Sequence, residues 1–345
     1  CEKKFCICVK IQFCETLTPL KKSNNSINPF LEVMESMRPL FASLEKYLLQ
    51  QAMTFEKEVR AAAKESILPK GKLIRPTLVF AAAAGGNADK MSLIRRAAIV
   101  ELTHLSTLIH DDVIDNASVR RGAATPNKKY GARTAILLGD AIFAHTMSIT
   151  FEENDAALSK KIANCVRTIC EGEIRQTLAD RKKNVTRRRY YEIAYGKTAV
   201  LFELACALGA MATTSKEGWI EAAEEAGKQL GIAYQIYDDI CDWFMSESDA
   251  GKTLGTDLIS GKQTYPLIIL MEKLPKKESA RLARNLPESN PSEIASQMRA
   301  LDVPDECSKE FMRRVSMAEK ILQGYPAEGK KLNEFCAAMR KLKLG

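Results

Sequence analysis

The sequence is poor in glycine and proline and lacks a paired-cysteine motif, and these shortages exclude several classes of protein. Gly at 18 and Pro at 12 are few for 345 residues, and aromatic residues make up 7%, which favours helices over a β-sandwich. No C-x-x-C pair is present, and the histidines are distant in sequence from the cysteines, so a zinc site is not expected. The later cysteines are scattered among apolar neighbours, which is typical of free thiols in a reducing compartment and predicts a cytoplasmic protein.

Long hydrophobic runs are also missing. The longest nearly apolar stretch, Ala199 to Ala212, is interrupted by Glu203 and is shorter than the ~20 residues of a membrane helix, so no transmembrane span is expected. Hydrophobic residues still make up 46% and charged residues 27%, an ordinary balance that excludes a disordered chain. The net charge of +8 fits either a solvated surface or a site for a polyanion, and no motif supports a nucleic-acid partner.

Apolar residues recur every three or four positions along most of the chain, which is the period of an α-helix. The pattern begins at Asn28 and Pro29, a helix-start signal, and Pro39 is placed to kink or divide the first helix. Further helices are predicted at about 50–67, 73–84, 91–115, 133–151, 155–180, 187–213, 217–243, 264–274, 277–285, 291–300, 305–323 and 327–342.

No convincing series of strands follows residue 28. The sequence therefore predicts one all-α domain over residues 28–345. We interpret residues 1–27 as an N-terminal extension that is poorly ordered or is the remnant of a leader, which is compatible with an organelle leader.

The strongest feature is a pair of acidic clusters, each at the end of an apolar helix. The first is HDDVID at 110–115, in which Asp111 and Asp115 lie four residues apart on one helical face, and the second is YDDICD at 237–242. Carboxylates repel one another, and the C-terminal end of a helix disfavours anions, so each cluster calls for a cation. One such cluster is readily a solvated helix end, but two of them facing each other could hold several Mg²⁺ ions with a diphosphate between them.

Basic residues lie near these clusters in sequence. They occur in GKLIRP at 71–76, in RRG at 120–122, in GKT at 196–198 and on both sides of GTD at 255–257. Each alone is more simply a surface charge. Together with the acidic clusters they describe Mg²⁺-bridged recognition of a diphosphate.

In these segments the sequence resembles the trans-isoprenyl diphosphate synthase family, most closely its long-chain octaprenyl and solanesyl types. The matching motifs follow the family's order and spacing, and they are GKLIRP (71–76), HLSTLIHDDVID (104–115), RRG (120–122), LLGD (137–140), EGEIRQ (171–176), GKTAVLF (196–202), YQIYDDICDW (234–243) and GKTLGTDLISGKQTYPL (251–267). The resemblance implies the isoprenoid synthase fold, with antiparallel helices around a central cavity, and a homodimer. It also implies an enzyme that condenses isopentenyl diphosphate with an allylic diphosphate into a linear all-trans polyprenyl diphosphate.

The resemblance also implies a role for individual residues. Three Mg²⁺ ions in the substrate complex would be held by Asp111, Asp115 and Asp238, with support from Asp112, Asp239 and Asp242. The allylic diphosphate would contact Arg120, Lys197, Lys252 and Lys262. Isopentenyl diphosphate would contact Lys72, Arg75, His104 and Arg121, and Thr198 and Gln235 would surround the reacting carbon. Asp111, Asp115, Asp238, Lys197 and Arg120 form the catalytic set, whereas His110 and His145 are expected to be structural.

Other members of the same fold remain as alternatives. A terpene cyclase needs no isopentenyl diphosphate site and usually carries Asn, Ser or Thr and Glu in its second metal motif, whereas this motif is rich in aspartate. A non-catalytic partner subunit typically loses aspartates, and here all six are present. A geranylgeranyl or farnesyl diphosphate synthase differs only in the length of the product.

Small residues before the first aspartate bear on that length. Thr103, Ser106 and Thr107, together with Val100, precede Asp111 at helical spacing, where short-chain members often carry a bulky aromatic floor. Their small size predicts a product longer than farnesyl diphosphate and favours a long chain over geranylgeranyl diphosphate. A floor supplied by another helix is the alternative, and its candidates are Phe143, Met147 and Phe151.

Overall fold

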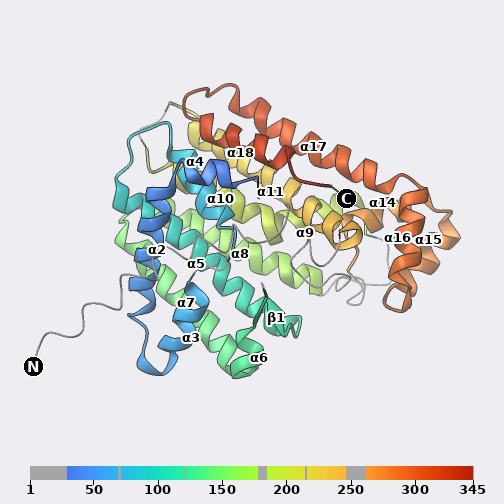
Figure 1. Cartoon of the computed structure of the whole chain (residues 1–345), viewed down its shortest axis with the longest axis horizontal. Coiled ribbons are helices and arrows are strands. Elements are labelled where there is room, and N and C mark those ends of the chain that lie inside the picture. Colours follow the sequence, from blue (N-terminus) through green and yellow to red (C-terminus); the bar gives the residue numbers. More distant parts are fainter. Residues whose placement is uncertain are drawn as a thin grey trace, which may run out of the picture.

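The computed structural model describes residues 29–68, 71–120, 122–177, 185–213, 216–245 and 262–344, and helices dominate these residues (Figure 1). The α-helices are α1 (Leu31–Glu35), α2 (Arg38–Ala52), α3 (Lys57–Ile67), α4 (Ile74–Ala83), α5 (Lys90–Ile114), α6 (Pro126–Tyr130), α7 (Ala132–Glu152), α8 (Ala156–Thr177), α9 (Arg187–Ala194), α10 (Val200–Ala210), α11 (Trp219–Phe244), α14 (Tyr265–Lys273), α15 (Lys276–Arg284), α16 (Pro291–Ala300), α17 (Val303–Leu322) and α18 (Lys330–Arg340). A π-helix, η3 (Tyr195–Ala199), joins α9 to α10, and a 3₁₀ turn, η4 (Leu286–Glu288), follows α15. The all-α prediction is confirmed.

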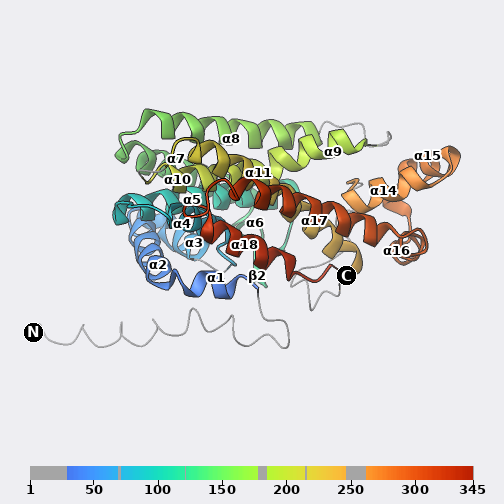
Figure 2. The ribbon, with the colours of Figure 1, turned by 90° about the horizontal axis from the view of Figure 1, so that it is seen from above.

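The most apolar helices form the centre of the bundle. Every residue of α10 except Glu203 is buried, because its sequence, VLFELACALGA, is apolar on all sides. α10 packs against α4, α5, α8 and α11, and α5 in turn packs along α7. Figure 2 shows α8 on one side of these central helices and α1 and α2 on the other. Two long helices that carry the acidic clusters, α5 and α11, are therefore fixed within the core.

Outer helices bury one stripe each. In α17 the buried residues recur every three or four positions from Val303 to Leu322, and they pack against α11. Phe311, at the middle of the stripe, is fully buried. Its replacement by alanine is expected to cost about 3–5 kcal/mol of folding free energy, because α11 would then line a cavity.

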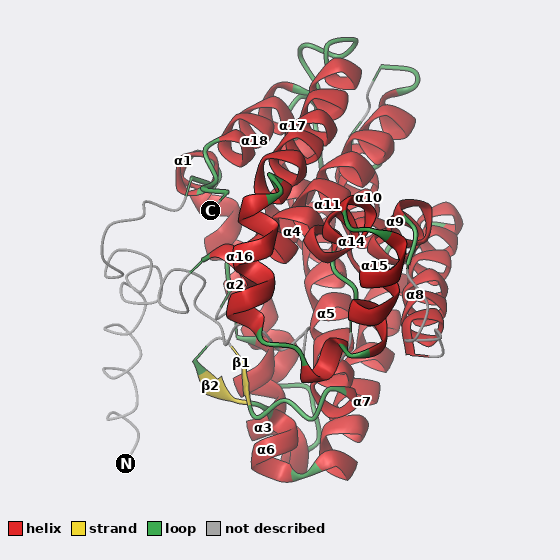
Figure 3. Cartoon of the chain, turned by 90° about the vertical axis from the view of Figure 1, so that its right-hand side faces the viewer, coloured by secondary structure: helices red, strands yellow, loops and turns green. Residues whose placement is uncertain are grey.

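Most helix boundaries agree with the predictions to within a few residues. The helix predicted at 50–67 begins only at Lys57, because residues 50–52 belong to α2, and α6 was not predicted. Three further local features differ from a plain helical pattern. Pro39 lies in the first turn of α2, so the first predicted helix is divided into α1 and α2. The predicted helix at 187–213 contains the π-helical turn η3, whose period is too close to that of an α-helix to be recognised in a sequence pattern. Strands β1 (Val119–Arg120) and β2 (Ala123–Ala124) form a hairpin next to α3 and α6 that is too short for an alternating pattern (Figure 3).

Two of the described helices are long and apolar enough to cross a membrane by length and composition, Ala132–Glu152 and Arg187–Ala210. The second is the core helix that includes α10, and most of it is buried. In α7 only 39% of the most apolar window is buried, and Ile136, Leu137 and Phe151 are exposed on it. α7 thus presents an apolar face that the described part of this chain leaves uncovered.

Candidate active site

The end of α5 places three carboxylates in three different environments. Asp112 is buried and accepts a hydrogen bond of 2.7 Å from Nε of Arg120, which lies on β1. Asp115 caps the helix, and its side chain is 43% exposed and accepts hydrogen bonds from Nζ of Lys262 at 3.1 and 3.2 Å. Asp111 is half-buried and lies about 40° around the helix from Asp115. The first cluster therefore already holds two of the predicted phosphate-binding cations, Arg120 and Lys262.

Asp111 has the most perturbed carboxyl group of this cluster. Burial raises the pKa of Asp111 to about 6, against the opposing charges of Lys197 and Arg120 and with a further contribution from Glu173 and Asp115. A carboxylate that is costly to ionise, surrounded by both cations and anions, is typical of a site built for an additional cation.

The second cluster, on α11, has a similar division of its carboxylates. Asp239 and Asp242 are buried, whereas Asp238 is half-buried. Oδ2 of Asp239 accepts hydrogen bonds from the Tyr190 hydroxyl at 2.8 Å and from the backbone N–H of Tyr265 at 2.9 Å. Asp239 is thus engaged with other elements of the protein.

Two separate links bring the clusters to one end of the bundle. In the first, Lys262 bonds Asp115 of the first cluster, and Tyr265, three residues later, bonds Asp239 of the second. Four residues span at most about 13 Å, so the two acidic helix ends lie close together.

The second link runs through the π-helix. Lys197 of η3 acts on the charge of Asp111, and the next residue, Thr198, donates a hydrogen bond of 2.5 Å to Oε1 of Gln235. Gln235 lies less than one turn before Asp238. Gly196 allows this arrangement, because a side chain there would come within 3.1 Å of Gly172 on α8.

The predicted isopentenyl diphosphate residues differ in their surroundings. Lys72 is exposed, and the guanidinium of Arg75 lies over the ring of Phe202 at 5.3 Å. His104 is half-buried on α5. Between the two basic residues of GKLIRP, Leu73 adopts a left-handed conformation with φ of 45°, a strained geometry that starts α4.

Two of the predicted substrate contacts, Arg121 and Lys252, lie outside the described residues. The two remaining histidines have structural contacts. Nε2 of His110 lies 3.2 Å from the carbonyl of Ile136, and its ring packs where any side chain on Gly139 would collide with it, which explains the glycine of LLGD. His145 lies 2.9 Å from Oε1 of Gln51.

The donor set of the two clusters fits a hard divalent cation. All of the candidate ligands are carboxylate oxygens, which Mg²⁺ and Ca²⁺ prefer. Within the described ranges, three His, Cys, Asp or Glu side chains nowhere converge closely enough to hold a metal by themselves.

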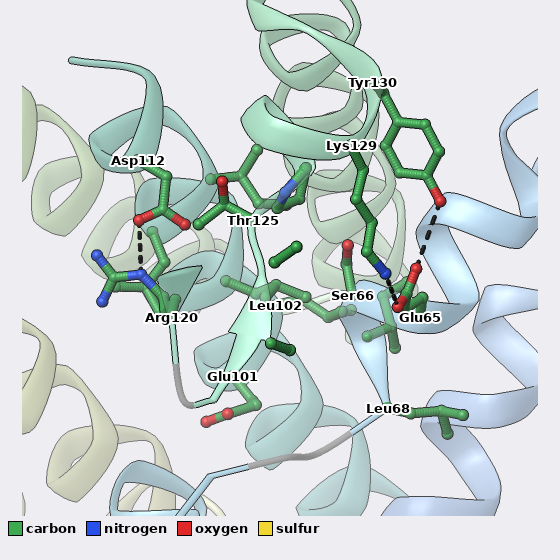
Figure 4. Close-up of a pocket in the computed structure, with 17 residues that line it drawn as sticks. Glu65, Ser66, Leu68, Glu101, Leu102, Asp112, Arg120, Thr125, Lys129 and Tyr130 are labelled. Carbon is green, nitrogen blue, oxygen red and sulfur yellow. Dashed lines mark hydrogen bonds and ion pairs between the residues drawn. The ribbon is translucent and has the colours of Figure 1, made fainter. Parts of the chain in front are cut away.

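A cavity of about 100 Å³ lies along the side of α5 that carries Leu105 and Asp112 (Figure 4). Leu102, Leu105 and Ile109 form its apolar wall, and the Asp112–Arg120 pair stands at one end. Of the residues predicted to control chain length, Thr103 and Thr107 lie roughly 160° around α5 from the centre of this lining, and Ser106 lies roughly 100° from it. This cavity is therefore not the predicted channel for the growing chain.

The chain-length residues themselves are small and largely buried. Thr103 and Ser106 are buried, and their hydroxyls donate to carbonyls of their own helix, whereas Thr107 is half-buried. Ser106 lies one turn before His110 and therefore points toward α7. Phe151 is 67% exposed, so within this chain it is not a floor for an internal channel.

Sequence reasoning missed three contributors to the site. Tyr190 and Tyr265 bind Asp239 from distant segments, and Glu173, in the EGEIRQ motif, contributes a negative charge near Asp111. Glu173 could have been suggested by its motif. Tyr265 lies in the motif at 251–267, but nothing in the sequence indicated that its backbone would bind Asp239. Tyr190 gave no signal, because it is an ordinary aromatic residue at a helical position.

The chain is similar to several known proteins. A family model described as polyprenyl synthetase matches residues 56–302. An all-trans-nonaprenyl-diphosphate synthase (geranyl-diphosphate specific) from Rhodobacter capsulatus is 31% identical over 82% of this chain and 89% of its own length. A short chain isoprenyl diphosphate synthase from Methanothermobacter thermautotrophicus is 30% identical over 73% of this chain and 79% of its own. The crystal structure of a polyprenyl synthase from Caulobacter crescentus, complexed with calcium and isoprenyl diphosphate, has a TM-score of 0.81 and 27% identity, and the match covers 92% of this chain and 98% of that one.

Proposed function

Because the chain belongs to the polyprenyl synthetase family, we propose that it condenses isopentenyl diphosphate with an allylic diphosphate into a linear all-trans polyprenyl diphosphate. The observation that carries this proposal is the meeting of two aspartate-ended helices with Lys197, Arg120 and Lys262 at one end of the bundle. The six carboxylates retained by the chain favour an active enzyme over a non-catalytic subunit.

The metal proposed for this site is Mg²⁺, in three ions when substrate is bound. Asp111, Asp115 and Asp238 would hold the ions, which when bound withdraw charge from the diphosphate and promote ionisation of the allylic C–O bond. The Caulobacter crescentus structure is complexed with calcium and isoprenyl diphosphate, which supports a divalent cation and an isoprenoid diphosphate as ligands here.

The cations of the chain would then act on the leaving group. Lys262 and Arg120 are held by Asp115 and Asp112, and both can exchange these carboxylates for diphosphate oxygens. Lys197, beside Asp111, adds a third positive charge. As the C–O bond breaks, its electron pair goes to the diphosphate, and these side chains stabilise the negative charge that develops there.

Carbon–carbon bond formation follows at the allylic cation. The double bond of isopentenyl diphosphate attacks the cation, and the departing diphosphate accepts the proton whose loss restores an alkene. The hydroxyl of Thr198 and the amide of Gln235, which are hydrogen-bonded to each other, would direct their oxygen dipoles toward the positive carbon. Lys72, Arg75, His104 and Arg121 would bind the second diphosphate.

The product proposed here is longer than farnesyl diphosphate and of the long-chain type. Thr103, Ser106 and Thr107 place small side chains at the positions of α5 where a bulky aromatic floor would stand, and Phe151 is turned toward solvent. Thr107 lies closest to the face of Asp111, so it is the residue from which the growing chain would first pass down α5.

A homodimer is proposed through the exposed face of α7. Ile136, Leu137 and Phe151 are uncovered there, and exposed large apolar side chains on one side of a helix favour association with a partner. A second copy fits this face better than a bilayer does, because α7 also carries Arg133 and Asp140, which are costly to place in lipid. The described cysteines are free thiols, which supports our proposal of a reducing compartment such as the cytoplasm.

The direct test is incubation of the purified protein with labelled isopentenyl diphosphate, Mg²⁺ and allylic primers of increasing length, followed by chromatography of the dephosphorylated products. We expect labelled linear polyprenols longer than farnesol, and no product in EDTA. Cyclic hydrocarbons formed without isopentenyl diphosphate would instead identify a terpene cyclase.

A further inference from the structure

Asp239 connects three helices through hydrogen bonds, so its carboxylate oxygens are already engaged within the protein. Its two oxygens accept hydrogen bonds from the Tyr190 hydroxyl on α9, from the backbone N–H of Tyr265 at the start of α14, and from Nε2 of Gln235 on α11, at 2.8, 2.9 and 2.8 Å. The side chain of Asp239 is buried, and so is that of Tyr190. Hydrogen bonds to a buried carboxylate are strong and geometrically restrictive, so Asp239 has a fixed orientation.

The hydrogen bonds of Asp239 continue to Gln235 and Thr198, the residues predicted to surround the reacting carbon. The same Gln235 that donates to Asp239 through Nε2 accepts the hydroxyl proton of Thr198 through Oε1, at 2.5 Å. Thr198 follows Lys197 in the π-helix that α9 leads into. A continuous chain of hydrogen bonds therefore runs from Tyr190 through Asp239 and Gln235 to Thr198.

Tyr190 is well suited to fix this chain. Its ring packs against that of Tyr265 with the centroids 5.0 Å apart, and α9 contacts both α11 and α14 (Figure 3). The ring is thus immobilised by packing, and the hydroxyl group of Tyr190 donates the hydrogen bond to Asp239. Removing that oxygen would leave the packing intact while one of the donors to a buried carboxylate is lost.

We propose that Tyr190 is a positioning residue, which holds Asp239 and through Gln235 fixes the Thr198 hydroxyl where the allylic carbon ionises, and that Asp239 orients the site instead of binding metal. The proposal rests on the prenyltransferase function proposed above. The proposal gives two adjacent aspartates different roles. Asp238 is the metal ligand, and Asp239 aligns the helix that carries Asp238.

The two aspartates can be compared by calorimetric titration of inorganic pyrophosphate in the presence of Mg²⁺. We expect Asp238→Asn to weaken binding by at least about tenfold, because a ligand oxygen is lost, and Asp239→Asn to change it by less than about threefold. An equal loss in both variants would show that Asp239 is a metal ligand and would overturn the assignment. This readout does not require turnover.

The role of Tyr190 is tested by Tyr190→Phe, with Tyr191→Phe as the matched control. Tyr191 is the next residue on α9, and its hydroxyl donates to Glu310 on α17 at 2.9 Å and lies 3.3 Å from the hydroxyl of Tyr265. Tyr265 bonds Asp239 through its backbone N–H, so the Tyr191 hydroxyl is not part of the bond to Asp239. We expect Tyr190→Phe to lower kcat about tenfold with little change in the KM for isopentenyl diphosphate, and Tyr191→Phe to retain wild-type kinetics.

A double-mutant cycle distinguishes positioning from general destabilisation. If Tyr190 acts through Thr198, the tenfold effect of Tyr190→Phe on kcat disappears when Thr198→Val is already present. Additive effects, or wild-type kcat in Tyr190→Phe, would refute the proposal while the wild-type enzyme still makes product. Absence of product from the wild-type protein would refute the function itself. If Tyr190→Phe does not fold, the pyrophosphate comparison of the two aspartates decides alone.

Discussion

Replacing Asp111 with asparagine is expected to stabilise the substrate-free protein while it destroys activity. Burial raises the pKa of Asp111 from 3.8 to about 6. The folded state holds the proton of Asp111 more tightly than the unfolded state does. The resulting contribution to stability is complete below the unfolded-state pKa of 3.8 and is lost as the pH rises through about 6. At pH 7.5 the ionised group therefore disfavours the folded state, whereas the neutral amide of an asparagine at this position would not.

The size of the effect follows from the two pKa values. Their difference sets an upper bound on the loss of folding free energy caused by ionisation of Asp111, which is about 3 kcal/mol at pH 7.5 and about 1 kcal/mol at pH 4.5. Because the side chain is partly solvated, we expect Asp111→Asn to gain about 1–2 kcal/mol at pH 7.5 and less than about 0.5 kcal/mol at pH 4.5.

Urea unfolding followed by circular dichroism, with a reducing agent to protect the free cysteines, measures this difference. Asp305→Asn, at an exposed position on α17, is the control and is expected to stay within about 0.5 kcal/mol at both pH values. Equal changes for Asp111→Asn at the two pH values, or destabilisation at pH 7.5, would refute a charge conflict at the end of α5.

Further variants test separate parts of the account. Asp238→Ala should abolish product formation and leave the circular dichroism spectrum unchanged, and retained turnover at saturating Mg²⁺ would exclude it as a ligand. Leu137→Glu should convert a dimer into a monomer in light scattering, since it places a charge on the exposed apolar face of α7; an unchanged mass would move the interface elsewhere. Thr107→Phe should shorten the product in chromatography, and an unchanged product length would place the floor on another helix. Ser106→Phe, at a buried position facing α7, should instead lower the free energy of unfolding by about 1–3 kcal/mol.

The helical scaffold could be predicted because each helix carries its own signal. α5 and α11 have apolar stretches that end in acidic residues, and the sequence places both ends to within one or two residues. The π-helix η3 was not predictable, because one wider turn scarcely alters the spacing of buried residues. The hairpin of β1 and β2 has two residues in each strand, fewer than any periodicity requires.

The chemistry of the site was predictable as a set of residues, whereas their division of labour was not. Spacing puts Asp111 and Asp115 on one face, but it does not reveal that Asp112 turns inward to bind Arg120. The partners of Asp239 come from residues 190 and 265, which are far from it in sequence, and only tertiary packing brings them together. Local pattern therefore identifies candidate ligands, and long-range contacts decide which of them are engaged within the protein.

The central claim is that the two aspartate helices jointly hold one metal-bridged diphosphate. Crystals grown with Mn²⁺ and inorganic pyrophosphate test it directly, because anomalous scattering locates each metal ion. The account predicts Mn²⁺ beside Asp111 and Asp115 and beside Asp238, with one pyrophosphate between them in contact with Lys197. Metal bound at only one of the two helices, or pyrophosphate bound elsewhere without metal, would contradict it.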